Sequence, residues 1–129
     1  MSTARPKILL AFDQQVRDGF MDPAEVQRLE TFADWTWLPC TGGGRSTHAR
    51  AQDDPSTRTQ LREQISGYDA LIVCHGAPLI DAAILDAAPT LRLIGELEGD
   101  RFAGRIDLEA AWARGIRTDA AAFSWKSDA

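Results

Sequence analysis

The sequence predicts an α/β protein, a three-layer sandwich whose central sheet holds five parallel strands in the order 2-1-3-4-5. Short apolar runs alternate along the chain with segments whose apolar residues recur at helical spacing, which indicates βαβ units. The first run, residues 7–12 (KILLAF), is apolar without alternation, as expected of a strand covered by helices on both faces. Because βαβ crossovers are right-handed, few topologies remain, and this order is the favoured one.

The first half of the chain is expected to contribute two strands and two helices. Asp13 ends the first apolar run, and the polar stretch after it is expected to form a loop. Asp22 can cap a helix that has Pro23 in its first turn and Glu25 three residues after the cap. The expected elements are a strand at 7–12, a loop at 13–22, a helix from 23, a strand at 35–38, a loop at 40–55 and a helix from 56 or 57 to 65.

The second half is expected to contribute three strands and two helices. Pro89 stops one helix, and Asp107 can cap the next, which Gly115 ends. The expected elements are a strand at 70–73, a turn at 75–78, a helix at 81–88, a strand at 91–94, a loop at 95–105, a helix at 107–114 and a strand at 116–118. We expect one domain over residues 1–118 and a frayed tail over residues 119–129.

The composition is that of a globular protein without a basic surface. The 129 residues carry a formal net charge of −5, with a pI of about 4.9 and 14 scattered basic residues. Nucleic-acid binders gain affinity by neutralising phosphates, so this balance argues against a DNA or RNA partner. No apolar run reaches the roughly 20 residues that span a bilayer, and the start lacks the features of a secretion signal. We therefore expect no membrane association and a cytoplasmic protein.

The two cysteines, Cys40 and Cys74, each follow an expected strand. These strands flank the first strand in the predicted order, so the cysteines should lie about 10 Å apart at about 4.8 Å per strand step. A disulfide requires Cα atoms within about 7 Å of each other. Two free thiols are therefore expected, which suits a reducing compartment.

Open parallel sheets bind ligands outside the carboxyl ends of their strands, and four expected loops meet there, at 13–22, 40–55, 74–80 and 95–105. No nucleotide-binding signature stands in them. The glycines at 42–44 do not open a helix, and the chain contains neither G-x-G-x-x-G nor GxxxxGK[ST]. We therefore assign no catalytic, cofactor-binding or metal-binding residue in this chain.

The loop after the third strand contains the small-residue turn His75-Gly76-Ala77. Backbone N–H groups of such a turn can approach an anion. The alternative is a plain turn in which Gly76 supplies the backbone angles and His75 is half exposed. A catalytic role for His75 is disfavoured, because no carboxylate nearby in the sequence orients it.

The loop after the fourth strand is rich in charge. Glu96, Glu98 and Asp100 are expected to be solvated. Arg101 differs in kind, since a guanidinium at a ligand-binding edge suits a carboxylate through bidentate hydrogen bonds. Arg105 could instead have a purely structural role, in which it pairs with Asp107 or Glu109 at the start of the following helix.

The end of the chain carries a family resemblance. Residues 84–95 read ILDAAPTLRLIG, and they are followed by a glycine-containing loop, by IDLEAA at 106–111 and by GIRT at 115–118. This series resembles the first, substrate-side lobe of the D-isomer-specific 2-hydroxyacid dehydrogenases, which ends with a glycine-containing loop, an ID-L-x-A-A helix and a G-I-x-V strand. The resemblance covers residues 6–118 in layout and is specific from residue 69 onward.

The resemblance implies a flavodoxin-like lobe and, in the full-length family, hydride transfer between NAD(P) and a small 2-hydroxy or 2-keto acid. It implies that two loops contact the substrate carboxylate, mainly through backbone N–H groups. The candidate substrate-binding residues are Cys74, His75, Gly76, Ala77, Glu98, Gly99, Asp100 and Arg101. The family's cofactor fingerprint and its catalytic Arg, Glu and His belong to later segments, and none of these positions exists here. We therefore expect a truncated or isolated lobe that is inactive alone.

Two further hypotheses remain open. The chain could be a non-catalytic interaction module, because the loss of returning C-terminal segments would leave apolar surface for a homo-oligomer or a missing cofactor domain. Trp112, in mid-helix, is accordingly expected at a core or interface position. Another flavodoxin-like protein is disfavoured, since Asp13 stands without the second acidic residue of a phosphoacceptor pair and DQQVRDG is not a phosphate loop.

Overall fold

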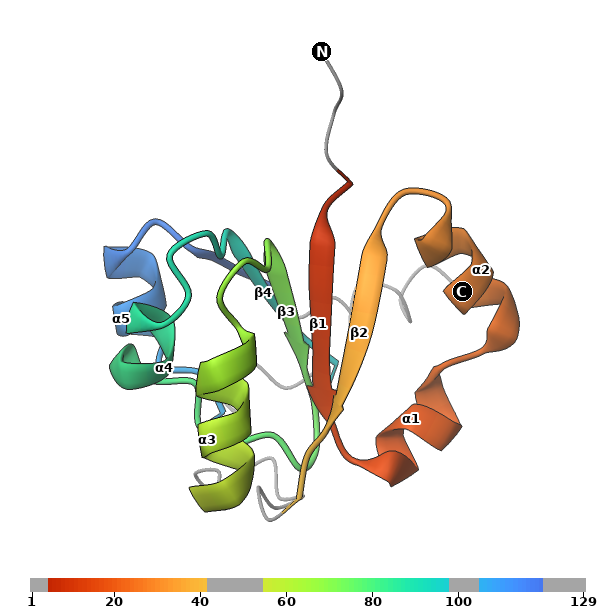
Figure 1. Cartoon of the computed structure of the whole chain (residues 1–129), viewed down its shortest axis with the longest axis horizontal. Helices are drawn as coiled ribbons and strands as arrows, with labels where there is room; N and C mark the ends of the chain where they lie inside the picture. The colour runs from red at the N-terminus through yellow and green to blue at the C-terminus, as the bar shows by residue number, and fades with distance from the viewer. Residues whose placement is uncertain (1–4, 42–54, 98–104, 120–129) are drawn as a thin grey trace.

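The computed structural model describes residues 5–41, 55–97 and 105–119, apart from the side chain of Phe20. Five parallel strands form one sheet in the order β2-β1-β3-β4-β5, as the sequence predicts (Figure 1). The strands are β1 (Lys7–Phe12), β2 (Asp34–Pro39), β3 (Ala70–Val73), β4 (Leu93–Glu96) and β5 (Arg117–Asp119).

Helices cover both faces of the sheet (Figure 1). On one side lie α3 (Pro55–Gln64), α4 (Ala82–Asp86) and α5 (Leu108–Ala113), and on the other lie α1 (Gln14–Phe20) and α2 (Pro23–Glu30). The three-layer α/β sandwich predicted from the sequence is therefore confirmed.

Alternate residues of the strands face two hydrophobic clusters. Leu9, Leu71 and Ile94 point into the larger cluster, which α3, α4 and α5 complete with Leu61, Ile65, Ile84, Leu85 and Ala111. Leu10 and Phe12 point into the smaller cluster with Val16 of α1, and Trp35, Trp37 and Ile72 are only partly buried against it. Burying both faces of β1 accounts for its unbroken apolar run.

Four aspartates cap helices. Asp13, Asp22, Asp81 and Asp107 each accept a hydrogen bond from a backbone N–H in the first turn of α1, α2, α4 and α5. Such a carboxylate satisfies a donor that the helix cannot satisfy itself and complements the positive end of the helix dipole. The expected caps at Asp22 and Asp107 are confirmed.

The expectation of a loop over residues 13–22 is wrong, because α1 occupies most of this stretch. Asp13 Oδ1 accepts a 2.8 Å hydrogen bond from the Val16 amide and so starts the helix. Among the described side chains of α1, Val16 is the one in the buried core. A seven-residue helix is too short to show an apolar periodicity that could be recognised in the sequence.

The fourth strand begins two residues later than expected. Leu91 donates its amide to Ala88 O at 3.2 Å and closes the turn after α4, so β4 starts at Leu93. The ladder then aligns Val73 with both Ala11 and Glu96. The ends of β1, β3 and β4 consequently meet at one edge of the sheet.

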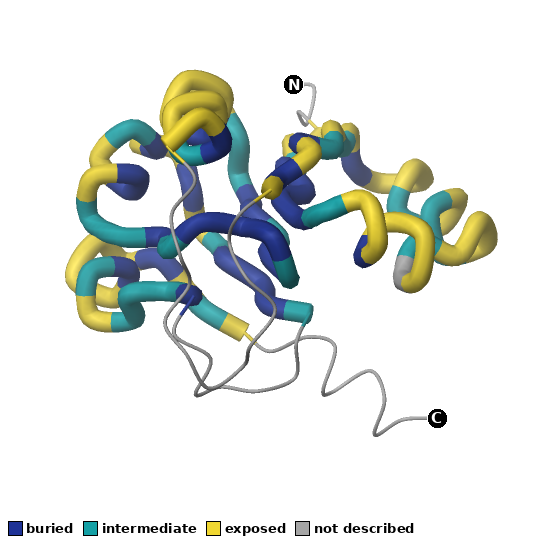
Figure 2. Tube along the Cα trace, turned by 90° about the horizontal axis from the view of Figure 1, so that it is seen from below, coloured by how far each residue is buried: buried dark blue, intermediate teal, exposed yellow. Residues whose placement is uncertain are grey.

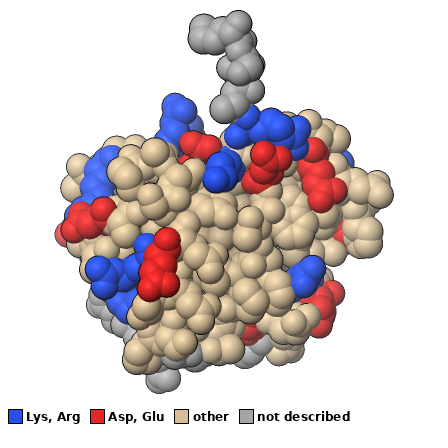
Figure 3. All heavy atoms as spheres, in the orientation of Figure 1, with Lys and Arg blue, Asp and Glu red and all other residues tan. Residues whose placement is uncertain are grey.

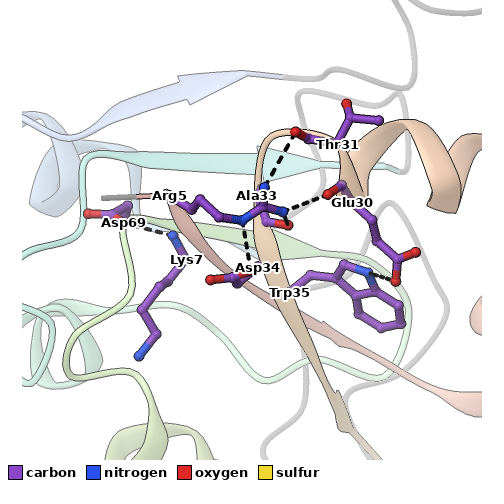
Figure 4. Close-up of polar contacts among 8 residues, drawn as sticks. All are labelled: Arg5, Lys7, Glu30, Thr31, Ala33, Asp34, Trp35 and Asp69. Carbon is purple, nitrogen blue, oxygen red and sulfur yellow. Dashed lines mark hydrogen bonds and ion pairs between the residues drawn. The ribbon is translucent and has the colours of Figure 1, made fainter. Parts of the chain in front are cut away.

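The opposite, amino-terminal edge holds a network of charged groups (Figure 4). The Arg5 guanidinium donates to Glu30 O at 2.6 Å, to Ala33 O at 2.7 Å and to Asp34 Oδ1 at 3.0 Å. In the view of Figure 3, charged side chains of both signs gather along this edge. These contacts tie the start of β1 to the end of α2, which gives this edge a structural role. In the described part of the chain, no helix has the length and apolar character needed to cross a bilayer.

Candidate functional site

The carboxyl-terminal edge of the sheet brings together segments from four parts of the chain. Figure 2 views the molecule from this edge and shows buried backbone, in dark blue, near the centre. Phe12 is followed by Asp13, Pro39 by Cys40, and Val73 by the turn at 74–77. The fourth part is the chain after β4, where Glu96 is the last residue of that strand and Arg105 contacts the same turn. We call this group of residues, Asp13, Cys40, Cys74–Ala77, Glu96 and Arg105, the carboxyl rim.

The turn at 74–77 is tight and closely packed. The Ala77 amide donates to Cys74 O at 3.1 Å, and Gly76 has a φ of +95°, which favours glycine. A Cβ on Gly76 would lie 2.8 Å from the Asp13 Cβ and 3.1 Å from the Cys40 carbonyl oxygen. The turn thus needs a glycine both for its backbone angle and for its contact with the two neighbouring loops.

Asp13 is one of the rim residues that were not selected as site residues from the sequence. Its amide donates to His75 O at 2.9 Å, while its carboxylate caps α1. The half-buried His75 therefore stands next to a segment containing a carboxylate, although the two are 62 positions apart in the sequence. The available signal was the place of Asp13 immediately after a buried strand, where parallel sheets carry their ligand-binding residues.

Arg105 lies in the rim and is 2% exposed. Its Nη1 donates to Ala77 O at 2.7 Å. Its backbone carbonyl accepts from the Ile80 amide at 2.8 Å, and Ile80 and Ile106 form an isolated parallel bridge. The sequence suggested a pairing with Asp107 or Glu109, but the carboxylate of Asp107 caps α5, and the buried guanidinium reaches across to the 74–77 turn.

Glu96 corrects a second expectation. It was expected in solvent, yet it is the last residue of β4 and is 5% exposed. Four predicted substrate-binding residues, Glu98, Gly99, Asp100 and Arg101, lie outside the described residues. The chain on either side of them is held at the rim, since the Leu97 amide donates to Val73 O at 3.0 Å and Arg105 holds Ala77.

Both cysteines are buried free thiols, as predicted. Cys40 belongs to the larger cluster and Cys74 to the smaller one, so their side chains lie on opposite faces of the sheet. The pKa of the Cys40 thiol is raised to about 12, chiefly by burial and also by the charge of Asp13, while the charge of Arg105 opposes the rise. Cys40 is therefore a protonated packing residue at neutral pH.

The rim offers no described site for a metal or for a dinucleotide. Among the described residues, no group of three or more His, Cys, Asp or Glu side chains could hold a metal ion. A dinucleotide pyrophosphate binds at a helix N-terminus that follows a glycine-rich turn. The N-termini of α1 and α4 instead hold the carboxylates of Asp13 and Asp81, which would repel phosphate. The N-termini of α1 and α4 therefore do not suit the pyrophosphate of NAD(P).

The sheet order and the helix layers define a flavodoxin-like α/β fold, and known proteins share it. No protein-family model and no curated protein matches this chain. The fold is similar to that of a protein from Ralstonia solanacearum described as a D-3-phosphoglycerate dehydrogenase, which is 22% identical with a TM-score of 0.60. That match covers 87% of this chain and 29% of the other.

Two more solved structures give the same result. A D-isomer-specific 2-hydroxyacid dehydrogenase from a Polaromonas species, described as NAD-binding, is 18% identical with a TM-score of 0.57, covering 90% of this chain and 30% of its own. A phosphoglycerate oxidoreductase from Vibrio cholerae is 20% identical with a TM-score of 0.60, covering 90% and 31%. This chain therefore shares the fold of a segment that makes up about 30% of the length of each of these dehydrogenases.

Proposed function

We propose that this chain is the substrate-side lobe of an NAD(P)-dependent 2-hydroxyacid dehydrogenase, and that its carboxyl rim binds the carboxylate of a small 2-hydroxy or 2-keto acid. The observation that carries the proposal is the shared fold, which covers 87–90% of this chain in the dehydrogenase structures. The chain's own ordered turn at the carboxyl ends of the strands supports it, because that edge is where open α/β sheets bind ligands.

In this proposal the 74–77 turn binds the acid through backbone N–H groups. Oriented N–H groups form an anion-binding concavity without a charged side chain. The buried guanidinium of Arg105 adds a positive charge beneath the turn, where low polarity strengthens its effect. Hydrogen bonds from the N–H groups of the turn to an ionised carboxylate are charge-assisted, and such bonds are among the stronger ones in proteins.

Hydride transfer itself needs a nicotinamide, whose chemistry comes from the cofactor. Because the carboxylate-capped helices α1 and α4 do not suit a pyrophosphate, we assign NAD(P) to a separate domain or chain. The 129-residue chain alone is expected to bind substrate weakly and to catalyse no turnover.

A titration followed by NMR tests this function. Pyruvate, as a simple 2-keto acid, is added to the 15N-labelled chain, and propionate serves as the control that lacks the 2-oxygen. The amide signals of His75 and Gly76 are expected to shift with pyruvate and much less with propionate. Calorimetry with NADH at millimolar concentration is expected to show no binding. Pyruvate shifts confined to residues away from the rim would refute the assignment.

A second candidate, an interaction module, is favoured by the incomplete packing around α2. None of the residues of α2 is buried, and Phe32, just after it, is 56% exposed. An open hollow of about 540 Å³ lies among α1, α2 and β2, lined in part by Met21, Val26 and Trp35. Exposed apolar surface of this kind favours association. Sedimentation velocity distinguishes the two, since a monomer across a hundredfold concentration range opposes self-association.

A further inference from the structure

Three carbonyl groups of the 74–77 turn accept hydrogen bonds from within the protein. Cys74 O accepts from the Ala77 amide, and His75 O accepts from the Asp13 amide. Ala77 O accepts from the Arg105 guanidinium. Each peptide plane carries its carbonyl and the next residue's N–H on opposite sides. Fixing the carbonyls of Cys74 and His75 therefore also fixes the directions of the N–H groups of His75 and Gly76.

The exit of the turn is a special position, because Pro78 follows Ala77 and has no N–H. The peptide plane between Ala77 and Pro78 therefore has only its carbonyl with which to form a hydrogen bond. Arg105 supplies the donor to that carbonyl at 2.7 Å. Among the described residues, Arg105 has the largest of the fully buried side chains, so this donor is shielded from water.

Arg105 is itself fixed at its backbone. Its carbonyl accepts from Ile80 at 2.8 Å, and Asp107 N donates to Ile80 O at 2.9 Å, so the bridge binds the residues on both sides of Ile106 to the segment after the turn. The guanidinium is planar and buried, so it loses little rotational freedom for each hydrogen bond that it forms. The bridge and the guanidinium together hold the turn from the side opposite Asp13.

We infer that Arg105 is a positioning residue: its buried guanidinium holds the Ala77 carbonyl and so keeps the backbone N–H groups of the 74–77 turn in the orientation that receives the substrate carboxylate. The inference rests on the proposed function and assigns a role to a residue outside the turn. Arg105 acts through the turn and does not itself need to touch the acid.

The test compares Arg105→Met and Arg105→Lys with Arg58→Met as a matched control. Arg58 donates to Leu79 O at 3.2 Å and to both carboxylate oxygens of Asp81, so it holds the same segment just beyond the turn. Amide shifts of Gly76 and Ala77 and the pyruvate dissociation constant are measured by NMR for the full chain. We expect Arg105→Met to displace both signals and to weaken pyruvate binding about tenfold, the effect of losing one charge-assisted hydrogen bond.

The other variants should separate positioning from general loss of structure. Arg105→Lys keeps a cationic donor and is expected to recover part of the affinity, whereas Arg58→Met should leave the dissociation constant within about twofold. The inference is overturned if Arg105→Met resembles Arg58→Met in both measurements. If Arg105→Met does not fold, the test uses the wild-type chain. NMR then measures the scalar coupling between Arg105 Nη1 and the Ala77 carbonyl carbon, which is transmitted across their hydrogen bond. Absence of this coupling would overturn the inference.

Failure of the proposed function has a different signature. A wild-type chain that does not respond to pyruvate refutes acid binding at the rim. The amide shifts then decide the role of Arg105 alone: displaced Gly76 and Ala77 signals in Arg105→Met support it, and unchanged signals overturn it.

Discussion

Substituting Gly76 by alanine tests the packing of the rim most directly. The structure offers a matched control in Gly67, which has nearly the same backbone angle, φ +93° against +95°. A Cβ on Gly67 meets nothing within 4 Å, whereas one on Gly76 meets the Asp13 Cβ at 2.8 Å and backbone atoms of Asp13 and Cys40 at 3.1 Å. The two variants share the conformational cost and differ only in the steric one.

The expected magnitudes follow from these contacts. An alanine at positive φ costs about 1–2 kcal/mol, which is the whole effect predicted for Gly67→Ala. Overpacking against a fixed backbone adds about 1–3 kcal/mol. Gly76→Ala should therefore lose about 2–5 kcal/mol in all, out of a total of about 5–15 kcal/mol for a typical domain. The chain is expected to stay folded, with its rim displaced.

Urea denaturation followed by tryptophan fluorescence measures both variants, and the slope shows whether unfolding remains two-state. The difference between the two free energies of unfolding is the steric contribution of the rim. If Gly76→Ala is no less stable than Gly67→Ala, the turn is not packed against Asp13 and Cys40, and the described site is wrong.

Three other predictions concern the same framework. Arg58→Met should lower the free energy of unfolding by about 1 kcal/mol at pH 7. Burial raises the pKa of Asp81, but hydrogen bonds from Arg58 and α4 outweigh it and leave this pKa below 3.8. The stability that the Arg58–Asp81 pair contributes is present above the unfolded-state pKa of Asp81 and is lost as pH falls through its folded-state pKa. The free energies of unfolding of the wild type and Arg58→Met should therefore converge in urea melts from pH 7 to pH 2, and a constant difference between them would contradict this. Native Cys40 should resist iodoacetamide at pH 8 and react in urea, as peptide mass spectrometry can show; rapid native labelling would contradict its burial. Asp107→Ala should cost about 1 kcal/mol in urea melts by removing a helix cap, whereas equal losses in Glu109→Ala, an exposed site on the same helix, would argue against capping.

The parts of the fold that are strongly encoded locally could be predicted. Residues 8–12 and 70–73 are apolar on both faces, so the strands 7–12 and 70–73 were found at their observed bounds. Asp22 and Asp107 indicated the starts of two helices, because a capping carboxylate stands immediately before the first helical residue. The sheet order followed from right-handed crossovers.

The misplaced or missed features are those that depend on long-range contacts. Among the described side chains of α1, Val16 is the buried one, and it packs in one cluster with Leu10 and Phe12 of β1. The start of β4 was misplaced because an apolar Leu91 suits both a strand and a buried turn. The hydrogen bond from its amide to Ala88 O places it in the turn. Glu96 looked like a loop residue by its charge, although the ladder places it beside Val73.

The candidate site divides in the same way. The sequence indicated the 74–77 turn, since small residues directly after a buried parallel strand lie at the edge where such sheets bind ligands. It placed Asp13 at the same edge but could not show which groups Asp13 contacts or that Arg105 is buried, because neither residue type shows in advance what it will contact.

The sequence by itself determined the class of fold and the sheet order, because apolar patterning and helix caps act over a few residues and chain chirality limits the rest; the edge at which a ligand binds stays a prediction. Tertiary structure alone decided that the Arg105 guanidinium holds Ala77 and that Gly76 lies against Asp13. These contacts join residues 28 and 63 positions apart, and such pairs are selected by the shape and polarity of a closed core, which no local segment specifies.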